Sequence, residues 1–484
     1  MRKHLRPLPG WSAAFALAGL AALACEHSPG APSSSGVPDR ILPTVTAILS
    51  YPMNGDLLAG AAIAAGQSLG VHADAHDDRR VAWIGTETHL VSGNQAFDHA
   101  DSVAIPDSAT HVTLDLTFTA PAGLAGAMIM RVFVRDAGGN RVTTNATPNP
   151  VSIYEVVSPS APSATLRDQG DVAYDGKRGV LYVTDPDDLA VRVLPVATLA
   201  TVTTLRPPGR PRGVDLTASG DSLVVTLDSS RSLAVYDLSA ASGSWKLLPL
   251  PADTIGLAPA HLAIGKSNRA LVGMTTDDYR GTPQVLEHDF ATGAERWRTD
   301  LPTTPRSPTW LAQVFRDFKG SVMVLVGDRT VMFDVASDAY LPYTAQGALL
   351  AADSAGDRFF LGGVSAIQLT DRGFDWFTPY AQSDVVALSS RGDSAFFRYW
   401  TASGQGLVRE VRLADGVAQQ ALLFGSIPDR LLYVPGRHPR LLVFAFGSVY
   451  SVALDSLPPL PAPPASAREL LAASLHVAGL HTVH

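Results

Sequence analysis

The sequence predicts an all-β protein, a β-sandwich followed by a seven-bladed β-propeller. Many short segments alternate apolar and polar residues, which is the period of a half-buried strand. The 41 glycines and 35 prolines supply the turns between such strands. A pattern of three apolar strands recurs seven times in the second half of the chain. The length of 484 residues is enough for two or three domains.

Residues 1–24 have the organisation of a secretory signal peptide. Arg2, Lys3 and Arg6 form a positive segment, and residues 12–24 are apolar but shorter than the roughly 20 residues that span a bilayer. Loss of these three cations takes the formal net charge from −8 to −11. An acidic chain without Lys/Arg clusters lacks the electrostatic footprint of nucleic-acid binding, so no nucleic-acid partner is expected.

The signal segment ends at Cys25, the only cysteine of the chain. The run Ala22-Leu23-Ala24-Cys25 resembles the lipobox of bacterial lipoproteins, with Ala22 where Leu is more common. The resemblance implies cleavage before Cys25, attachment of lipid to its sulfur, and anchorage to the membrane. Glu26, in place of Asp, implies the outer membrane of the cell envelope and leaves the periplasmic or surface-facing side open. The alternative is an ordinary signal peptide with a chance cysteine.

Residues 25–41 are rich in Ser, Pro and Gly and are expected to form a flexible tether. Residues 42–156 form the first predicted domain, with about seven short strands. Residues 69–75 and 112–118 each place apolar side chains at every second position, so each segment has one apolar face. The segment Asp136–Asn140 is expected to be the turn of a hairpin.

The stretches "AHDDRRVAWIG" and "RVFVRDAGGNRV" resemble bacterial immunoglobulin-like domains of the cell surface. In that family a D-x-x-G-V turn precedes the central strand and a D-x-x-G-N turn precedes the last strand. Arg80 stands where the family usually has Gly. The resemblance implies that residues 42–156 form an immunoglobulin-like β-sandwich, which the predicted seven-bladed β-propeller follows, although only the two turns are specific.

Residues 160–457 are predicted to form the propeller. Each repeat opens with a short apolar strand and continues with two more, at intervals of 36 to 49 residues. The seven openings begin at Gly170, Pro211, Pro259, Pro308, Gly347, Ser383 and Pro428. A four-stranded blade cannot bury both its faces alone, so the blades must stack in a ring. Because the last repeat lacks a fourth strand, Ser163–Asp168 is expected to supply it and close the ring.

The stretch "GVLYVTDPDDLAVRVLPVATLATVTTL" resembles the repeat of YVTN-type propellers, and the repeats are broadly WD40-like in size. The stretch "DFATGAERWRTDL" resembles the strand-turn-strand of quinoprotein propellers. It occurs once, which argues against a quinoprotein oxidoreductase, and no cofactor is expected. Residues 458–484 are predicted to be a Pro-rich linker followed by a short C-terminal helix or a disordered tail.

No catalytic signature stands out, since the chain has no G-x-S-x-G elbow, P-loop or H-E-x-x-H motif. His72 and His76 are expected on one face of a strand but too far apart for one metal ion. The loop "TDPDD" is a weak candidate for a metal site, although turns favour Asp in any case. Its carboxylates are those of Asp185, Asp187 and Asp188.

The openings of the repeats are expected to surround the mouth of the central channel, where propellers place their ligands. Their charged and aromatic residues, which could orient and stack a polar or sugar-like ligand, are Asp171, Arg212, His261, Trp310, Asp384 and Asp429. The sequence therefore favours a non-catalytic, membrane-anchored envelope lipoprotein that recognises a protein or glycan. The alternative is a propeller hydrolase or lactonase with a metal at the channel mouth, and enzymatic activity is left open.

Overall fold

The computed structural model describes most of the chain between residues 41 and 457. The described ranges are 41–50, 62–93, 96–106, 109–147, 151–168, 170–240, 243–251, 257–275, 284–298, 313–316, 322–326, 329–346, 348–352, 358–362, 367–371, 376–380, 385–389, 393–400, 405–413, 418–445 and 447–457. Within these ranges the protein is all-β, with two short 3-10 helices at Pro186–Asp188 and Leu454–Ser456. No helix in these ranges is long and apolar enough to cross a membrane. The predicted signal peptide, Cys25, the tether and the tail lie outside them.

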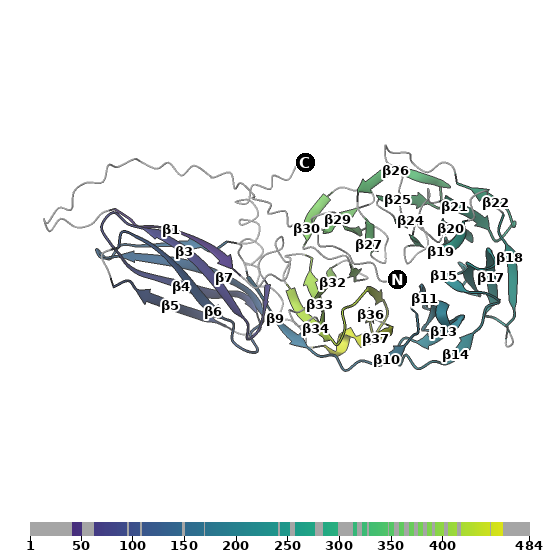
Figure 1. Cartoon of the computed structure of the whole chain (residues 1–484), viewed down its shortest axis with the longest axis horizontal. Helices are drawn as coiled ribbons and strands as arrows, with labels where there is room; N and C mark the ends of the chain where they lie inside the picture. The colour runs from purple at the N-terminus through teal and green to yellow at the C-terminus, as the bar shows by residue number, and fades with distance from the viewer. Residues whose placement is uncertain are drawn as a thin grey trace, which may run out of the picture.

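The N-terminal part folds into two sheets that share one core (Figure 1). The first sheet has the order β1-β3-β6. Its strands are β1 (Thr44–Ser50), β3 (Ser68–His76) and β6 (His111–Thr119). The second sheet is built around β7, which pairs with β4, β8 and β9. Its strands are β2 (Ala62–Ala64), β4 (Val81–Gly93), β5 (Asp98–Ala104), β7 (Gly126–Asp136), β8 (Arg141–Asn145) and β9 (Val151–Val157).

The alternation in β3 decides which side of the first sheet is buried. Leu69, Val71, Ala73 and Ala75 are fully buried against the second sheet, as the sequence pattern predicted. The intervening side chains, from His72 to His76, therefore face solvent. Burial of the apolar face holds the register of the strand, because a shift by one residue would exchange the two faces.

The two predicted turns of this domain are held by aspartates. The carboxylate of Asp136 accepts the backbone N–H of Asn140 at 2.8 Å, and Gly139 has a φ of +91° that favours glycine. Asp77 accepts the backbone N–H groups of Arg79 and Arg80. Arg80 is not among the residues with positive φ, so this turn tolerates Arg where Gly was expected.

The described residues between 163 and 453 form a ring of antiparallel sheets, a β-propeller (Figure 1). Each four-stranded unit is called a blade below. The first strands of most successive blades contact one another, which stacks the blades around a centre. In chain order the strands are β10 (Ser163–Thr165), β11 (Val172–Asp175), β12 (Val180–Asp185), β13 (Ala190–Pro195), β14 (Thr203–Leu205), β15 (Pro211–Leu216), β16 (Ser222–Leu227), β17 (Ser232–Asp237), β18 (Trp245–Pro249), β19 (Ala258–Ile264), β20 (Arg269–Thr275), β21 (Gln284–Asp289), β22 (Glu295–Trp297), β23 (Gln313–Arg316), β24 (Val322–Val326), β25 (Arg329–Asp334), β26 (Ala339–Gln346), β27 (Ala348–Ala352), β28 (Arg358–Gly362), β29 (Ile367–Asp371), β30 (Trp376–Tyr380), β31 (Val386–Leu388), β32 (Ser394–Trp400), β33 (Gly406–Arg412), β34 (Ala418–Phe424), β35 (Arg430–Val434), β36 (Arg440–Ala445) and β37 (Ser448–Ala453).

The last blade is closed by the strand that precedes the first. β10 pairs with β37 in antiparallel register, so the sheet order is β10-β37-β36-β35. The N–H of Leu166 extends this pairing to the carbonyl of Gly447 at 2.7 Å. The segment predicted to close the ring therefore does so, and it joins the two ends of the propeller through backbone hydrogen bonds.

The strand β9 belongs to both parts of the molecule, and the predicted domain boundary at residue 156 falls within it. The first half of β9 pairs with β7, and its second half runs parallel to β34 of the propeller. Tyr154, in the middle of β9, is buried in the blade core, and its hydroxyl accepts a 3.0 Å hydrogen bond from Arg409. The N-terminal sheet and the blade β31–β34 are consequently one continuous sheet of ten strands.

Candidate functional site

The candidate site lies where the first strands of neighbouring blades meet. β15 and β19 approach so closely that a Cβ on Gly213 would lie 2.9 Å from the Cα of His261. A residue with a side chain would therefore force the two strands apart. Each strand also has an irregularity in its pairing near this point, between Pro211 and Val214 and between Pro259 and His261. These irregularities redirect the side chains of the strand openings.

Asp171 lies at the seam between the first and last blades. One of its carboxylate oxygens accepts Nη1 of Arg430 at 3.1 Å and the N–H of Val172 at 2.8 Å. The other oxygen accepts the N–H of Val214 in the next blade at 3.4 Å. Asp171 thus joins three blades, and its charge is balanced by Arg430.

Arg212 is held in place by its own blade and by the preceding one. Its Nε donates to Asp228 at 2.9 Å, and its backbone carbonyl accepts the hydroxyl of Thr184 at 2.7 Å. The same hydroxyl accepts the N–H of Asp171 at 2.6 Å. The starts of β11 and β15 are therefore linked through one buried threonine.

His261 is the unusual member of this group. Its Nε2 atom is buried, yet it has no hydrogen-bond partner among the described residues. Burial lowers the pKa of the imidazole, the negative charge of Asp171 opposes that shift, and the positive charges of Arg430 and Arg212 add to it. The ring is therefore neutral at neutral pH, and one buried ring nitrogen is left with an unused hydrogen-bonding capacity.

The other predicted channel residues contribute less to this group. Asp429 is exposed, and its backbone N–H donates to Phe444. Its charge raises the pKa of Arg398, whereas burial of that guanidinium lowers it and is the larger effect. Trp310 and Asp384 lie outside the described residues. Sequence reasoning missed Arg430, whose only signal was its position next to Asp429 in a strand opening.

The carboxylates of the acidic loop "TDPDD" are already paired with arginines and backbone amides. Asp185 is fully buried and accepts the N–H groups of Arg167 and Asp168. Asp188 pairs with Arg192, and Asp187 lies 3.4 Å from Arg210. Guanidinium groups at these positions oppose a bound cation, so the geometry does not favour the metal site considered for this loop.

The described channel residues also do not assemble a metal centre. Asp171, His261 and Asp429 do not form a group of three ligand atoms within 4.8 Å of one another in the described part of the chain. A metal-dependent hydrolase would need such a convergence. The described residues instead provide a neutral imidazole within electrostatic reach of two arginines and an aspartate, which suits hydrogen bonding to a polar ligand.

Comparisons with known proteins give no family for this chain. No family model matches the chain, and no curated protein matches it. Among solved structures, the β-propeller domain of Cps50 (Swd1) from Myceliophteria thermophila has 12% sequence identity and a TM-score of 0.46, covering 60% of this chain and 99% of that one. A likeness of this size has no functional implication. By its own sheets, this is an all-β protein that contains a β-propeller.

Proposed function

We propose that this protein is a non-catalytic, lipid-anchored cell-envelope protein whose propeller recognises a protein or glycan. In this proposal Cys25 bears the lipid, residues 25–41 are the tether, and the protein is located in the outer membrane. The two-sheet N-terminal part is an immunoglobulin-like spacer and the propeller has seven blades. Six separate four-stranded sheets and the group β31–β34 support the number of blades.

The observation that carries the proposed binding role is the buried Nε2 of His261, which has no hydrogen-bond partner among the residues that the structure describes. A buried polar atom without a partner costs free energy, about 1–3 kcal/mol, unless a ligand or water satisfies it. The charges of Asp171 and Arg430 both act on His261. The Asp171 carboxylate offers hydrogen-bond acceptors, and the Arg430 guanidinium with which it pairs offers donors. A ligand with several hydroxyl or amide groups would use all of these together.

Affinity capture from envelope extracts tests the binding role. The wild-type protein is compared with a His261→Ala/Trp310→Ala variant and with His89→Ala, a control in an exposed pair of the N-terminal part. The proposal expects a partner or glycan recovered by the wild type and by the control but not by the double variant. Equal recovery by all three proteins would contradict it.

Cell fractionation tests the anchor separately. Cys25→Ser removes the proposed lipid attachment point, so the protein should move from the membrane fraction to the soluble fraction and lose incorporation of labelled palmitate. Glu26→Asp is the matched variant, because it keeps the lipid and should move the protein to the inner membrane. Retention of Cys25→Ser in the membrane fraction would show that another element anchors the protein.

A further inference from the structure

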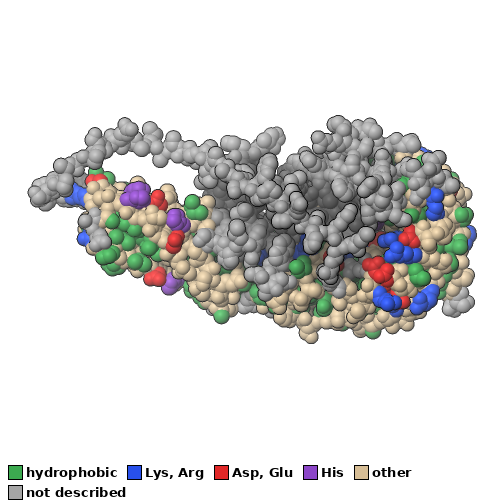
Figure 2. All heavy atoms as spheres, in the orientation of Figure 1, with side chains coloured by type: hydrophobic (Ala, Val, Ile, Leu, Met, Phe, Trp, Pro, Cys, Tyr) green, Lys and Arg blue, Asp and Glu red, His purple; other side chains and the backbone are tan. Residues whose placement is uncertain are grey.

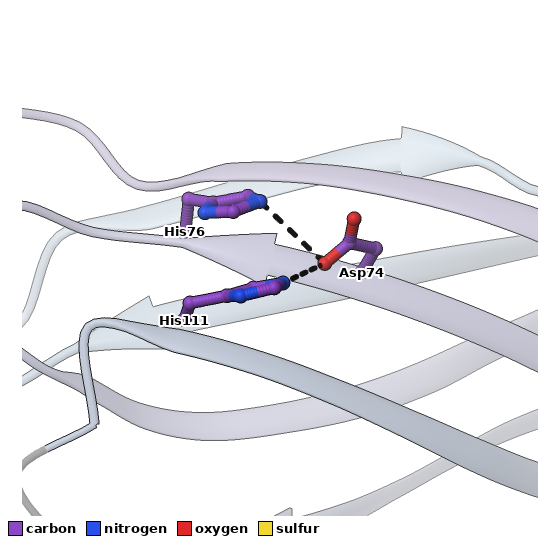
Figure 3. A group of neighbouring side chains, drawn as sticks. All are labelled: Asp74, His76 and His111. Carbon is purple, nitrogen blue, oxygen red and sulfur yellow. Dashed lines mark hydrogen bonds and ion pairs between the residues drawn. The ribbon is translucent and has the colours of Figure 1, made fainter.

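The solvent-exposed face of the first sheet gathers two histidines and one aspartate from neighbouring strands. Asp74 and His76 belong to β3, and His111 belongs to β6 directly opposite His76 in the register (Figure 3). One ligand atom from each of the three residues lies within 4.8 Å of the others. This cluster is on the N-terminal part, in a different sheet from the strands that carry His261.

The distances within the cluster are close to those of a metal coordination sphere. Oδ1 of Asp74 lies 2.7 Å from Nε2 of His111 and 3.5 Å from Nε2 of His76. Ligand atoms at the corners of a tetrahedral zinc site are about 3.3–3.6 Å apart, given metal–ligand bonds of about 2.0–2.2 Å. To bind a metal, the Asp74 carboxylate would therefore need to shift by less than about 1 Å, and its hydrogen bond to His111 would be replaced by a bond to the metal.

The side chains have the freedom to make this adjustment. The two imidazoles are stacked, with ring centroids 4.0 Å apart and planes 8° apart. His76 and His111 are 55% and 54% exposed, so the rings can turn about χ2 until their Nε2 lone pairs meet at one point. The fully buried opposite face of β3 meanwhile fixes the backbone that carries Asp74 and His76. The site is thus mobile only in its side chains.

We propose that Asp74, His76 and His111 bind one divalent transition-metal ion. Two imidazoles and one carboxylate suit zinc, nickel or copper, whereas calcium and magnesium prefer oxygen ligands alone. Three protein ligands leave a fourth position for water or for a group from another molecule. The hydroxyl of Thr113 lies 3.5 Å from both Asp74 Oδ1 and His111 Nε2, where it can hydrogen-bond the carboxylate in the bound state.

Isothermal titration calorimetry of the full chain with Zn²⁺ alone tests the proposal. The background carries His476→Asn, His481→Asn and His484→Asn, so that histidines of the C-terminal tail do not contribute. We expect one ion per chain. His111→Asn or Asp74→Asn should weaken binding at least tenfold. Loss of a residue that only supports a ligand typically lowers metal affinity by about 10–100-fold, and loss of a direct ligand should cost no less.

The matched control is His89→Asn, which removes the histidine of an exposed His–Asp pair that lacks a second histidine. It should leave zinc affinity unchanged. With Cu²⁺, the electron paramagnetic resonance spectrum should show two coordinated nitrogens, and one after His76→Asn. His76, His89 and His111 are exposed and Asp74 is partly exposed, and thermal unfolding checks that each variant folds. Absence of zinc binding at millimolar concentration, equal weakening by His89→Asn, or full affinity in His111→Asn would overturn the proposal.

Discussion

The two parts of the molecule use charged side chains in different ways. In the propeller, arginines and carboxylates meet where blades contact each other, and several are buried. On the N-terminal part, histidines and aspartates pair on exposed strand faces, and Figure 2 shows purple and red side chains together on its visible surface. Charged groups therefore link neighbouring blades in one region and lie exposed on the sheet surface in the other.

The clearest case of the first kind lies between β21–β22 and the turn that precedes β26. The side chain of Arg298 is 1% exposed and donates to Glu287 at 2.7 Å and to Asp338 at 3.0 Å. Arg296 and Arg269 contact the same two carboxylates. The guanidinium of Arg298 also lies 4.7 Å from the ring centroid of Phe333 in the next blade. Charge, hydrogen bonds and ring contacts thus converge on one blade seam.

Glu287→Ala should have the largest effect on stability. It leaves three arginines with Asp338 as their shared acidic partner at the seam, and loss of one partner from a buried ion pair costs about 3–5 kcal/mol. Asp98→Ala removes the acid of an exposed His–Asp pair in the N-terminal part and should change the free energy of unfolding by less than about 1 kcal/mol. Urea unfolding of both variants measures the contrast, and equal losses would remove the distinction between the two regions.

Leu166→Ala tests ring closure with the next largest effect. Leu166 is 4% exposed, follows β10, and packs between the first and last blades. Truncation of a buried leucine costs about 2–5 kcal/mol. Because the loss falls on the seam, limited proteolysis should also begin to cut within β35–β37. A variant as stable as wild type would mean that the ring is held closed by other contacts.

Tyr154→Phe tests the junction between the two regions. The change keeps the buried ring and removes the hydroxyl that accepts Arg409, so the expected cost is about 1–3 kcal/mol. Because β9 belongs to both parts, we expect the thermal transitions of both to move down together in scanning calorimetry. A shift in only one transition would show that the continuous sheet does not couple them.

Acid titration should separate the regions by the pH at which they lose stability. Burial lowers the pKa of His261 below its ordinary value of 6.5. As pH drops below 6.5, the unfolded state therefore binds a proton at this residue more readily than the folded state does, and the stability of the propeller falls. The slope from this group is at most about 1.4 kcal/mol per pH unit. The pKa of Asp74 is lowered below 3.8 by its hydrogen bond to His111, so that contribution is lost only below pH 3.8. His261→Gln should flatten the first slope and leave the second.

Much of the fold followed from local pattern, because alternation and turn residues act within a few positions. The faces of β3, the Asp136 hairpin and the starts of most blades are examples, and β10 closes the ring as expected. The pairing of β9 with β34 could not be predicted, since it joins strands more than 250 residues apart. The spacing of His72 and His76 predicts that they are too far apart to share a metal ion. The second histidine of the cluster instead comes from β6, because the register sets His111 opposite His76.

The candidate site shows the same limit. Aligning the strand openings identified Asp171, Arg212 and His261, which the structure brings into one electrostatic group. The pairing of Asp171 with Arg430 depends on which blades meet when the ring closes, and no local pattern encodes that contact.

Glycan-array and peptide-array binding by the purified protein, with His261→Phe and His89→Phe as variants, tests the central claim most directly. The account predicts ligands bound by the wild type and by His89→Phe and weakened at least tenfold in His261→Phe, because the phenyl ring keeps the packing but removes the unsatisfied nitrogen. Unchanged binding by His261→Phe, or no ligand that separates the two variants, would contradict a binding site at the openings of the propeller strands.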